Sequence, residues 1–288
     1  MIWFFLSLST AVFEATKDLF SKKGLREIDE YLVAWGLRAF ALPFLLPLLF
    51  FIPIPKVTSQ FWWALFIGGG LNALTSILYM KAIKISPLSL TVPMLTFTPL
   101  FLLLTSPIIL GEFPGIFGII GILLIVFGSY LLNIQVMKNG YLAPFKALIK
   151  EKGPILMLIV AFIWSITSNI DKIGVLNSSP IFWAISINIF LFFTLLFIVS
   201  LKSKVNLKRQ ILQNTKVLFP IGLFSALALI CQMTAIKMAL VAFVISIKRT
   251  STIFSSLYGF FIFKEPFLKL RLVGILIMVL GVFLIALF

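Results

Sequence analysis

Residues 112–131 read EFPGIFGIIGILLIVFGSYL, and residues 265–284 read EPFLKLRLVGILIMVLGVFL. A shift of 153 positions superimposes the two stretches, and over residues 82–131 it produces 13 identities in 50 positions. Each stretch is a largely apolar run of about twenty residues, which is the length of helix that crosses a bilayer core about 30 Å thick. The sequence therefore predicts a membrane protein built from two related units.

Ten apolar runs of this length can be placed along the chain. They lie near residues 2–21, 31–51, 61–82, 86–108, 114–134, 154–175, 181–201, 217–238, 240–263 and 268–287. We therefore predict a five-helix unit at 1–137, a connecting loop at 138–153 and a second five-helix unit at 154–288. Because five is odd, the second unit enters the membrane upside down relative to the first. The predicted fold class is an all-α integral membrane protein, with ten transmembrane helices arranged as two inverted five-helix repeats.

The composition excludes several classes of protein. Hydrophobic residues make up 61% of the chain and charged residues only 11%, whereas a soluble domain carries about 25% charged residues. This excludes a soluble enzyme and a disordered chain. The net charge of +15 comes mainly from lysines and arginines between the apolar runs, which indicates contact with a lipid bilayer and no nucleic-acid partner.

The residue types present also limit the chemistry. The chain has no histidine and one cysteine, Cys231, so a His-based metal site or a Cys-His catalytic pair cannot be built. We expect no enzyme activity, no metal and no cofactor.

The order and spacing of several short motifs resemble one family of transporters. The motifs are Leu37-Arg38, Tyr79-Met80-Lys81-Ala82-Ile83, Pro87 with Pro99, Gly111-Glu112, Ile247-Lys248-Arg249-Thr250-Ser251 and Lys264-Glu265. In this pattern the chain is similar to EamA-type members of the drug/metabolite transporter superfamily. The resemblance implies a central cavity lined mainly by helices 1, 3, 4, 6, 8 and 9, and transport of small metabolites without ATP hydrolysis. The sequence agrees, since it contains no GxxxxGK[ST] nucleotide-binding loop.

Charged residues inside the predicted spans are candidates for function, because a charge in the membrane interior needs a cavity or a partner. Glu14, Lys17 and Asp18 fall on one stripe of the first helix. We interpret Glu14 and Asp18 as coupling or gating carboxylates that bind a coupling proton or cation; the alternatives are an internal ion pair with Lys17 or a helix end near the headgroups. Arg38 needs an anion, for which Glu14 or Asp18 is the expected partner, and it either orients helix 1 or contacts substrate.

Lys248 and Arg249 are adjacent cations on an otherwise apolar ninth helix. Neighbours on a helix point about 100° apart, so an anionic substrate between them would explain the pair. The pair is similar to a phosphate-binding Lys-Arg pair of the triose-phosphate and nucleotide-sugar translocators, relatives in the same superfamily. Their further lysine in the fourth helix has no counterpart, since residues 86–108 contain no Lys or Arg. The alternatives are neutralisation by Glu14 and Asp18, or a helix end whose cations reach the headgroups.

Four uncharged polar residues complete the predicted substrate pocket, namely Asn72, Tyr79, Asn169 and Gln232. Each of them could instead hold helices together through hydrogen bonds. Pro93 and Pro99 are expected to interrupt the fourth helix. The glycine pairs 121/128 and 274/281 each lie on one helix face and predict close packing of the fifth and tenth helices.

The main functional hypothesis is a secondary active transporter, an exporter or exchanger, of a small polar metabolite that can be anionic. It would work by alternating access through a central cavity, as a multi-pass protein of the plasma membrane and as a monomer or weak homodimer. The alternatives are a flippase for a lipid-linked phosphate and a membrane receptor or scaffold that does not transport.

The orientation in the membrane follows from the basic residues of the connections. The connections that follow odd-numbered helices contain nearly all of these basic residues, including Lys22, Lys23, Arg26, Lys138, Lys146, Lys150, Lys152, Lys202, Lys204, Lys208, Arg209 and Lys216. The positive-inside rule then predicts that both termini lie outside the cell. The family resemblance implies the opposite, with both termini in the cytoplasm.

Overall fold

The computed structural model describes residues 1–24, 30–86, 92–134, 151–202, 207–263 and 269–287. These residues form helices and the turns between them, without a strand. The elements are α1 (Ile2–Gly24), α2 (Glu30–Ala39), α3 (Leu42–Leu45), η1 (Leu46–Phe50), α4 (Ser59–Ile85), η2 (Val92–Phe97), α6 (Thr98–Leu110), α7 (Ile116–Ile134), α9 (Lys152–Leu176), α10 (Pro180–Lys202), α11 (Leu207–Met238), α12 (Val241–Lys248), α13 (Ser251–Phe263) and α14 (Lys269–Leu287). Pro87, Lys264, Glu265 and most of the predicted 138–153 loop lie outside the described residues.

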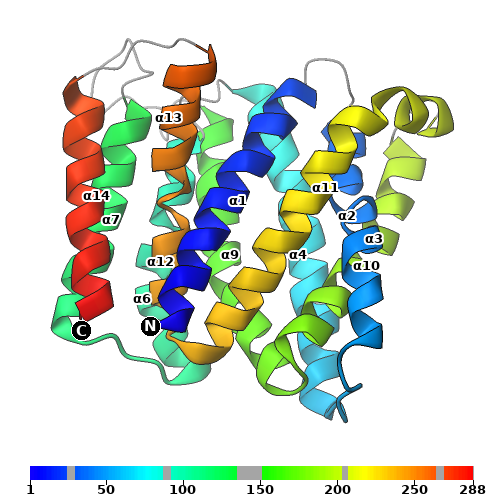
Figure 1. Ribbon diagram of the computed structural model, residues 1–288, viewed down its shortest axis with the longest axis horizontal. Helices are drawn as coiled ribbons and strands as arrows, with labels where there is room; N and C mark the ends of the chain where they lie inside the picture. The colour runs from blue at the N-terminus through cyan, green and yellow to red at the C-terminus, as the bar shows by residue number, and fades with distance from the viewer. Residues whose placement is uncertain (25–29, 87–91, 135–150, 203–206, 264–268, 288) are drawn as a thin grey trace.

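The elements form ten passes through the molecule, because α2–α3–η1, η2–α6 and α12–α13 each make one pass (Figure 1). Both termini lie at the same end of the bundle, hereafter the terminal end. Helix α1 runs away from this end, whereas α9, which opens the second unit, runs toward it (Figure 1). The predicted fold class, an all-α membrane protein with two inverted five-helix repeats, is confirmed.

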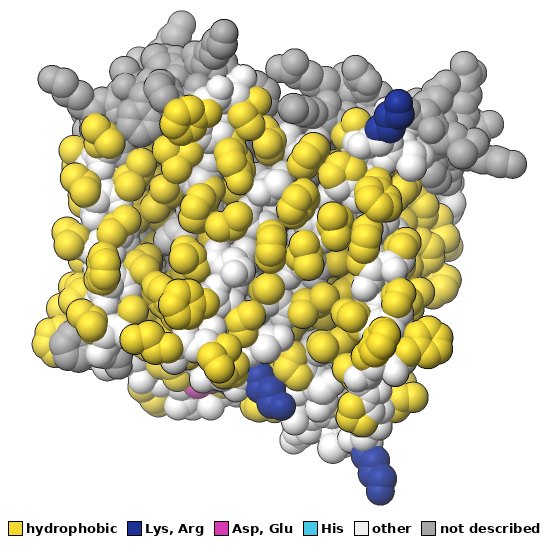
Figure 2. Space-filling view, viewed as in Figure 1, with side chains coloured by type: hydrophobic (Ala, Val, Ile, Leu, Met, Phe, Trp, Pro, Cys, Tyr) yellow, Lys and Arg dark blue, Asp and Glu magenta, His cyan; other side chains and the backbone are white. Residues whose placement is uncertain are grey.

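Hydropathy is consistent with this arrangement. By length and composition alone, five stretches of the described residues can cross a membrane: Tyr31–Phe50, Ser59–Tyr79, Lys152–Leu176, Pro180–Lys202 and Asn214–Met238. Shorter apolar helices are Met94–Leu110, Ile116–Leu132 and Leu272–Leu287. The face seen in Figure 2 is covered by hydrophobic side chains, with basic side chains near its upper and lower edges. Many large apolar side chains are exposed on the surface, as side chains in contact with lipid would be. Examples that are more than half exposed are Phe127, Phe193 and Leu280.

Three passes are interrupted, and two of the interruptions correct the sequence analysis. The second pass was expected to be continuous, but it breaks after Ala39, where Pro43 and Pro47 follow. The fourth pass changes from a 3₁₀-helix to an α-helix at Thr98, beside Pro99, as the prolines predicted. The ninth pass was expected to be one helix, but α12 ends at Lys248 and α13 begins at Ser251. This last break contains no proline, so the residue pattern gave no signal for it.

Helices α7 and α14 pack against each other at one edge of the bundle (Figure 1). Gly128 faces the backbone of Gly274, and Gly121 faces the backbone of Gly281. A Cβ atom on Gly128 would lie 2.6 Å from the Gly274 carbonyl oxygen, and backbone atoms at such a seam cannot move aside easily. The prediction that these glycines permit close backbone approach is confirmed, and the structure shows that the contact joins the last helices of the two units.

Gly128→Val should destabilise the protein by about 1–3 kcal/mol, because the new side chain forces α7 and α14 apart. The measurement is thermal or denaturant unfolding of the purified protein in detergent. Gly70→Ala is the matched control, since nothing lies within 4 Å of a Cβ at that position. Equal stability of the two variants would contradict the close backbone contact.

A reporter fused after Phe288 tests the orientation in the membrane. The basic residues Lys152 and Lys202 lie at the end of the bundle opposite the termini, so the positive-inside rule predicts an extracytoplasmic C-terminus. Alkaline phosphatase, which is active outside the cytoplasm, should be active in the fusion, and a cytoplasm-dependent fluorescent protein should be dark. The reverse pair of signals would favour the orientation implied by the family resemblance.

Candidate functional site

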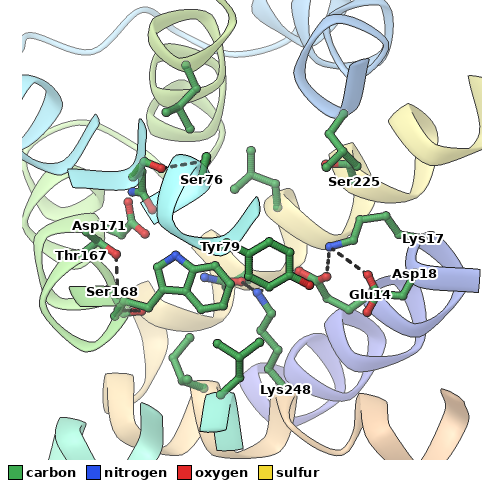
Figure 3. A pocket seen from close by; sticks show the side chains of 18 of the residues that line it. Glu14, Lys17, Asp18, Ser76, Tyr79, Thr167, Ser168, Asp171, Ser225 and Lys248 are labelled. Atoms are coloured by element: carbon green, nitrogen blue, oxygen red, sulfur yellow. Dashed lines mark hydrogen bonds and ion pairs between the residues drawn. The ribbon is translucent and has the colours of Figure 1, made fainter. Parts of the chain in front are cut away.

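A cavity of about 350 Å³ lies between the two units. It draws side chains from both units, and in addition to the passes that the resemblance implied it is lined by α2 and α10. Eight of the nine predicted site residues line it: Glu14, Asp18, Arg38, Asn72, Tyr79, Gln232, Lys248 and Arg249. Figure 3 shows several of them pointing toward one another from different helices.

Glu14 is the centre of the ionic network. One carboxylate oxygen of Glu14 pairs with Lys17, one turn along α1, and the other lies 2.8 Å from the Lys248 ammonium of α12. Lys17 also lies 3.7 Å from a carboxylate oxygen of Asp18 (Figure 3). The side chain of Asp18 is 60% exposed, although the residue lines the cavity. Glu14 therefore holds two helices together, while Asp18 keeps access to water.

The break between α12 and α13 separates Lys248 from Arg249. Lys248 pairs with Glu14 and also donates a hydrogen bond of 2.7 Å to the Gln232 amide oxygen. Arg249 turns the other way, where its Nη2 donates to the Thr98 hydroxyl at 2.8 Å. Of the explanations for the cation pair, internal neutralisation describes Lys248, whereas no carboxylate among the described residues pairs with Arg249.

Arg249, which lines the cavity, retains unused hydrogen-bonding capacity. Its Nε atom is buried and has no hydrogen-bond partner, and a buried unpaired donor is costly unless a ligand or water satisfies it. Its guanidinium lies 5.9 Å from the centroid of the Trp164 ring, within the range of a cation–π contact.

An aromatic wall stands beside Arg249. The Trp164 indole N–H donates to the Thr75 hydroxyl at 3.1 Å, which fixes the ring, and Trp164 stacks with Tyr79 at a centroid distance of 6.0 Å. The wall belongs to α4 and α9, which occupy the first and second units respectively. One side of the cavity therefore carries the Glu14 network, and the other is aromatic, with Asp171 of α9 also among its lining residues.

Arg38 lines the cavity, but Glu14, one of its two expected partners, pairs with other cations. Glu14 is taken by Lys17 and Lys248, and in the described ranges neither Glu14 nor Asp18 forms an ion pair with Arg38. The expectation that one of these carboxylates neutralises Arg38 is wrong in this conformation. The sequence could not rank the competing cations, because their distances from Glu14 depend on helix packing.

Asn169 is the one predicted pocket residue that lies elsewhere. It is fully buried, its amide nitrogen donates to the Thr105 hydroxyl at 3.1 Å, and its amide oxygen accepts a hydrogen bond from Ser106 at 2.8 Å. It therefore ties α9 to α6, which is the alternative role that polar residues in membrane helices can have.

Several cavity residues were not predicted as part of the site. Lys17 was noted only as a partner on the helix 1 stripe. Asp171, whose carboxylate accepts a 3.0 Å hydrogen bond from the Trp183 indole, was not among the predicted site residues. Thr98 had one signal, its place beside the predicted break of the fourth helix. Its contact with Arg249 crosses 151 residues and depends on tertiary structure.

Comparison with known proteins gives the family. The model of the EamA-like transporter family matches residues 1–134 and 151–287. An uncharacterized transporter of Archaeoglobus fulgidus is 24% identical over 292 residues, which cover 100% of this chain and 99% of the relative. A protein of known crystal structure superposes with a TM-score of 0.77 at 14% identity, over 99% of this chain and 96% of that chain, and shares the fold. The chain is thus a multi-pass membrane transporter that belongs to the EamA-like transporter family.

Proposed function

We propose that this protein is a secondary active transporter that moves a small organic anion by alternating access through the central cavity. The observation that carries the proposal is Arg249, whose buried Nε has no partner beside an ionic cavity between two inverted units. Inverted repeats with a site between them are a common plan for alternating-access carriers. An anion at this position would satisfy the free donor and neutralise the guanidinium.

The charges around the cavity favour a ligand with a single negative charge. Lys17 and Lys248 are both engaged by Glu14, with Asp18 close to Lys17. Among the cavity-lining residues that the structure describes, Arg249 and Arg38 are then the cations without an ion-paired carboxylate, and Asp171 adds one further carboxylate to the wall. Residues 92–110 of the fourth pass carry no Lys or Arg, so they add no further charge for a phosphate dianion. A carboxylate, which an arginine fork binds through two parallel hydrogen bonds, suits this arrangement better.

The aromatic side of the cavity would receive the body of the ligand. Trp164 and Tyr79 present rings, and apolar residues of α2, α10 and α11 also line the cavity: Val33, Ala34, Leu37, Ile187, Leu191, Leu229 and Met233. A wall of this kind with a few polar groups is typical of sites for small organic molecules. The substrate we propose therefore has a carboxylate at one end and an apolar or aromatic part at the other.

Glu14 and Asp18 are proposed as the gating and coupling carboxylates. Lys248 links Glu14 on α1 to Gln232 on α11. An anion bound near Arg249 would attract Lys248 away from Glu14 and so loosen α1 from α12. Asp18, which is exposed to cavity water, is the residue to which a coupling proton or cation would bind. Because the cavity lies within a single chain, a monomer in the plasma membrane would suffice.

Arg249→Ala should abolish binding and flux of the transported anion while the protein remains folded. Thermal-shift screening would compare carboxylates with their uncharged amides, starting with phenylacetate and phenylacetamide, and phosphate esters in parallel. Flux of the best ligand would then be measured in proteoliposomes, with the exposed Lys56→Ala as a charge-removal control. Unchanged uptake by Arg249→Ala would remove the anion from the proposal, and tighter binding of phosphate esters would replace carboxylate with phosphate.

Glu14→Gln should lower the free energy of unfolding by up to about 3 kcal/mol, because it leaves Lys17 and Lys248 without a shared carboxylate in a largely apolar environment. Adding Lys248→Met should recover part of the loss, since one of the two unpaired cations is then gone. A double-mutant cycle measured by unfolding in detergent gives the coupling. Strictly additive losses would mean that the Glu14–Lys248 contact has no energetic role.

A further inference from the structure

A second ionic cluster lies at the terminal end, away from the cavity. Glu112, in the turn between α6 and α7, pairs with Lys172 near the end of α9. The same carboxylate accepts a hydrogen bond of 2.9 Å from the Val241 backbone N–H, and Lys172 donates one of 2.8 Å to the Ala239 carbonyl oxygen. The two side chains are only 13% and 12% exposed. They therefore form a nearly closed set of contacts, which we call the terminal latch: Glu112, Lys172, Ala239 and Val241.

The backbone explains why Glu112 reaches this place. Gly111 ends α6 with φ at +68°, a conformation that glycine adopts without strain. The turn leaves Glu112 facing the first residue of α12. Leu240, the residue that precedes α12, provides no side-chain cap, so the carboxylate of Glu112 supplies the acceptor and the negative charge that a helix N-terminus favours.

The latch connects the two units and leads to the cavity. Glu112 belongs to the first unit, whereas Lys172, Ala239 and Val241 belong to the second. Helix α12 begins at Val241 and ends at Lys248, next to Arg249, so its first residue is held by the latch and its last lies in the ionic network. Lys172 directly follows Asp171, which lines the cavity. The latch thus fixes both α9 and α12 relative to the first unit.

We propose that the terminal latch closes the terminal end of the cavity and positions Lys248 and Arg249 through α12. The inference rests on the proposed alternating access, in which one unit rocks against the other. Opening toward the terminal end would require the cross-unit contacts there to break, and the latch is a charged contact of that kind. Once Glu112 releases Val241, the first turn of α12 loses its acceptor, and the helix that carries Lys248 is free to shift.

The test measures access to the cavity from each side and needs no substrate. In a Cys231→Ser background, Ser168→Cys places a thiol on the cavity wall. A membrane-impermeant maleimide is applied to sealed vesicles on the side of the C-terminus, which a tag after Phe288 identifies, and separately on the opposite side. Labelling is compared in the parent protein and in variants with Glu112→Gln and with Lys172→Gln, after unfolding measurements show that each variant is folded.

We expect both variants to be labelled about tenfold faster than the parent from the terminal side, because a charge-assisted contact of the closed state is lost. From the opposite side the rate should not rise. Lys172→Gln keeps a donor for Ala239 and provides a second variant if Glu112→Gln does not fold. The matched control is Glu151→Gln, which changes a glutamate before α9 at the other end of the bundle.

A charge exchange separates the latch from a simple ion pair. The double variant Glu112→Lys with Lys172→Glu restores opposite charges, but the lysine cannot accept from Val241 and the glutamate cannot donate to Ala239. We therefore expect it to remain as accessible as Glu112→Gln. Unchanged labelling in all latch variants, or an equal rise in the labelling rate from both sides, would overturn the latch. Return of the labelling rate to that of the parent protein in the exchange variant would overturn the role of the α12 backbone.

Failure of every anion to be transported would refute the proposed function. It would not decide the latch proposal, which is tested by the labelling rates alone.

Discussion

Charges inside an apolar membrane must be paired or hydrated, and this constraint organises the centre of the protein. Glu14 meets it by contacting Lys17 within α1 and Lys248 across to α12, so that a single carboxylate joins the first helix to the ninth pass. The residues that this network leaves without a carboxylate, Arg249 and Arg38, face the cavity. Ionic pairing therefore stabilises the helix arrangement and also determines which cations remain for a ligand.

The two units share a fold, but they contribute differently to the cavity. With the shift of 153 positions, Lys248 and Arg249 fall on Leu95 and Thr96, so the equivalent break in the first unit carries no charge. That break instead presents Thr98, which binds the Arg249 guanidinium. The two units thus share the inverted frame but differ in the side chains that they present to the cavity. A polar ligand with an apolar body would bind such a cavity in one orientation.

The two units contact each other in two different ways, through apolar packing at one edge of the bundle and through polar contacts at the terminal end. At one edge α7 and α14 meet through glycines whose backbones lie too close for any side chain, which makes this seam rigid. At the terminal end Glu112 and Lys172 connect the units through ionic and hydrogen-bonded contacts, which can form and break as discrete states. A rigid apolar seam beside a breakable polar contact is the combination that a rocking motion of one unit against the other requires.

The sequence by itself determined the ten spans, the inverted repeat, the glycine faces of the fifth and tenth helices and eight of the cavity residues, because apolar run length, duplication and the cost of a buried charge can be read locally. Tertiary structure alone decided that Lys248 pairs with Glu14 while Arg249 does not, and that Asn169 connects α9 to α6. It also decided that Glu14 pairs with Lys17 and Lys248 and forms no ion pair with Arg38. Tertiary structure also decided the break after Lys248, where the sequence contains no proline that would have indicated it. The pairing of Lys248 with Glu14 depends on the distance between two helices more than two hundred residues apart in the chain, and residue spacing carries no information about that distance.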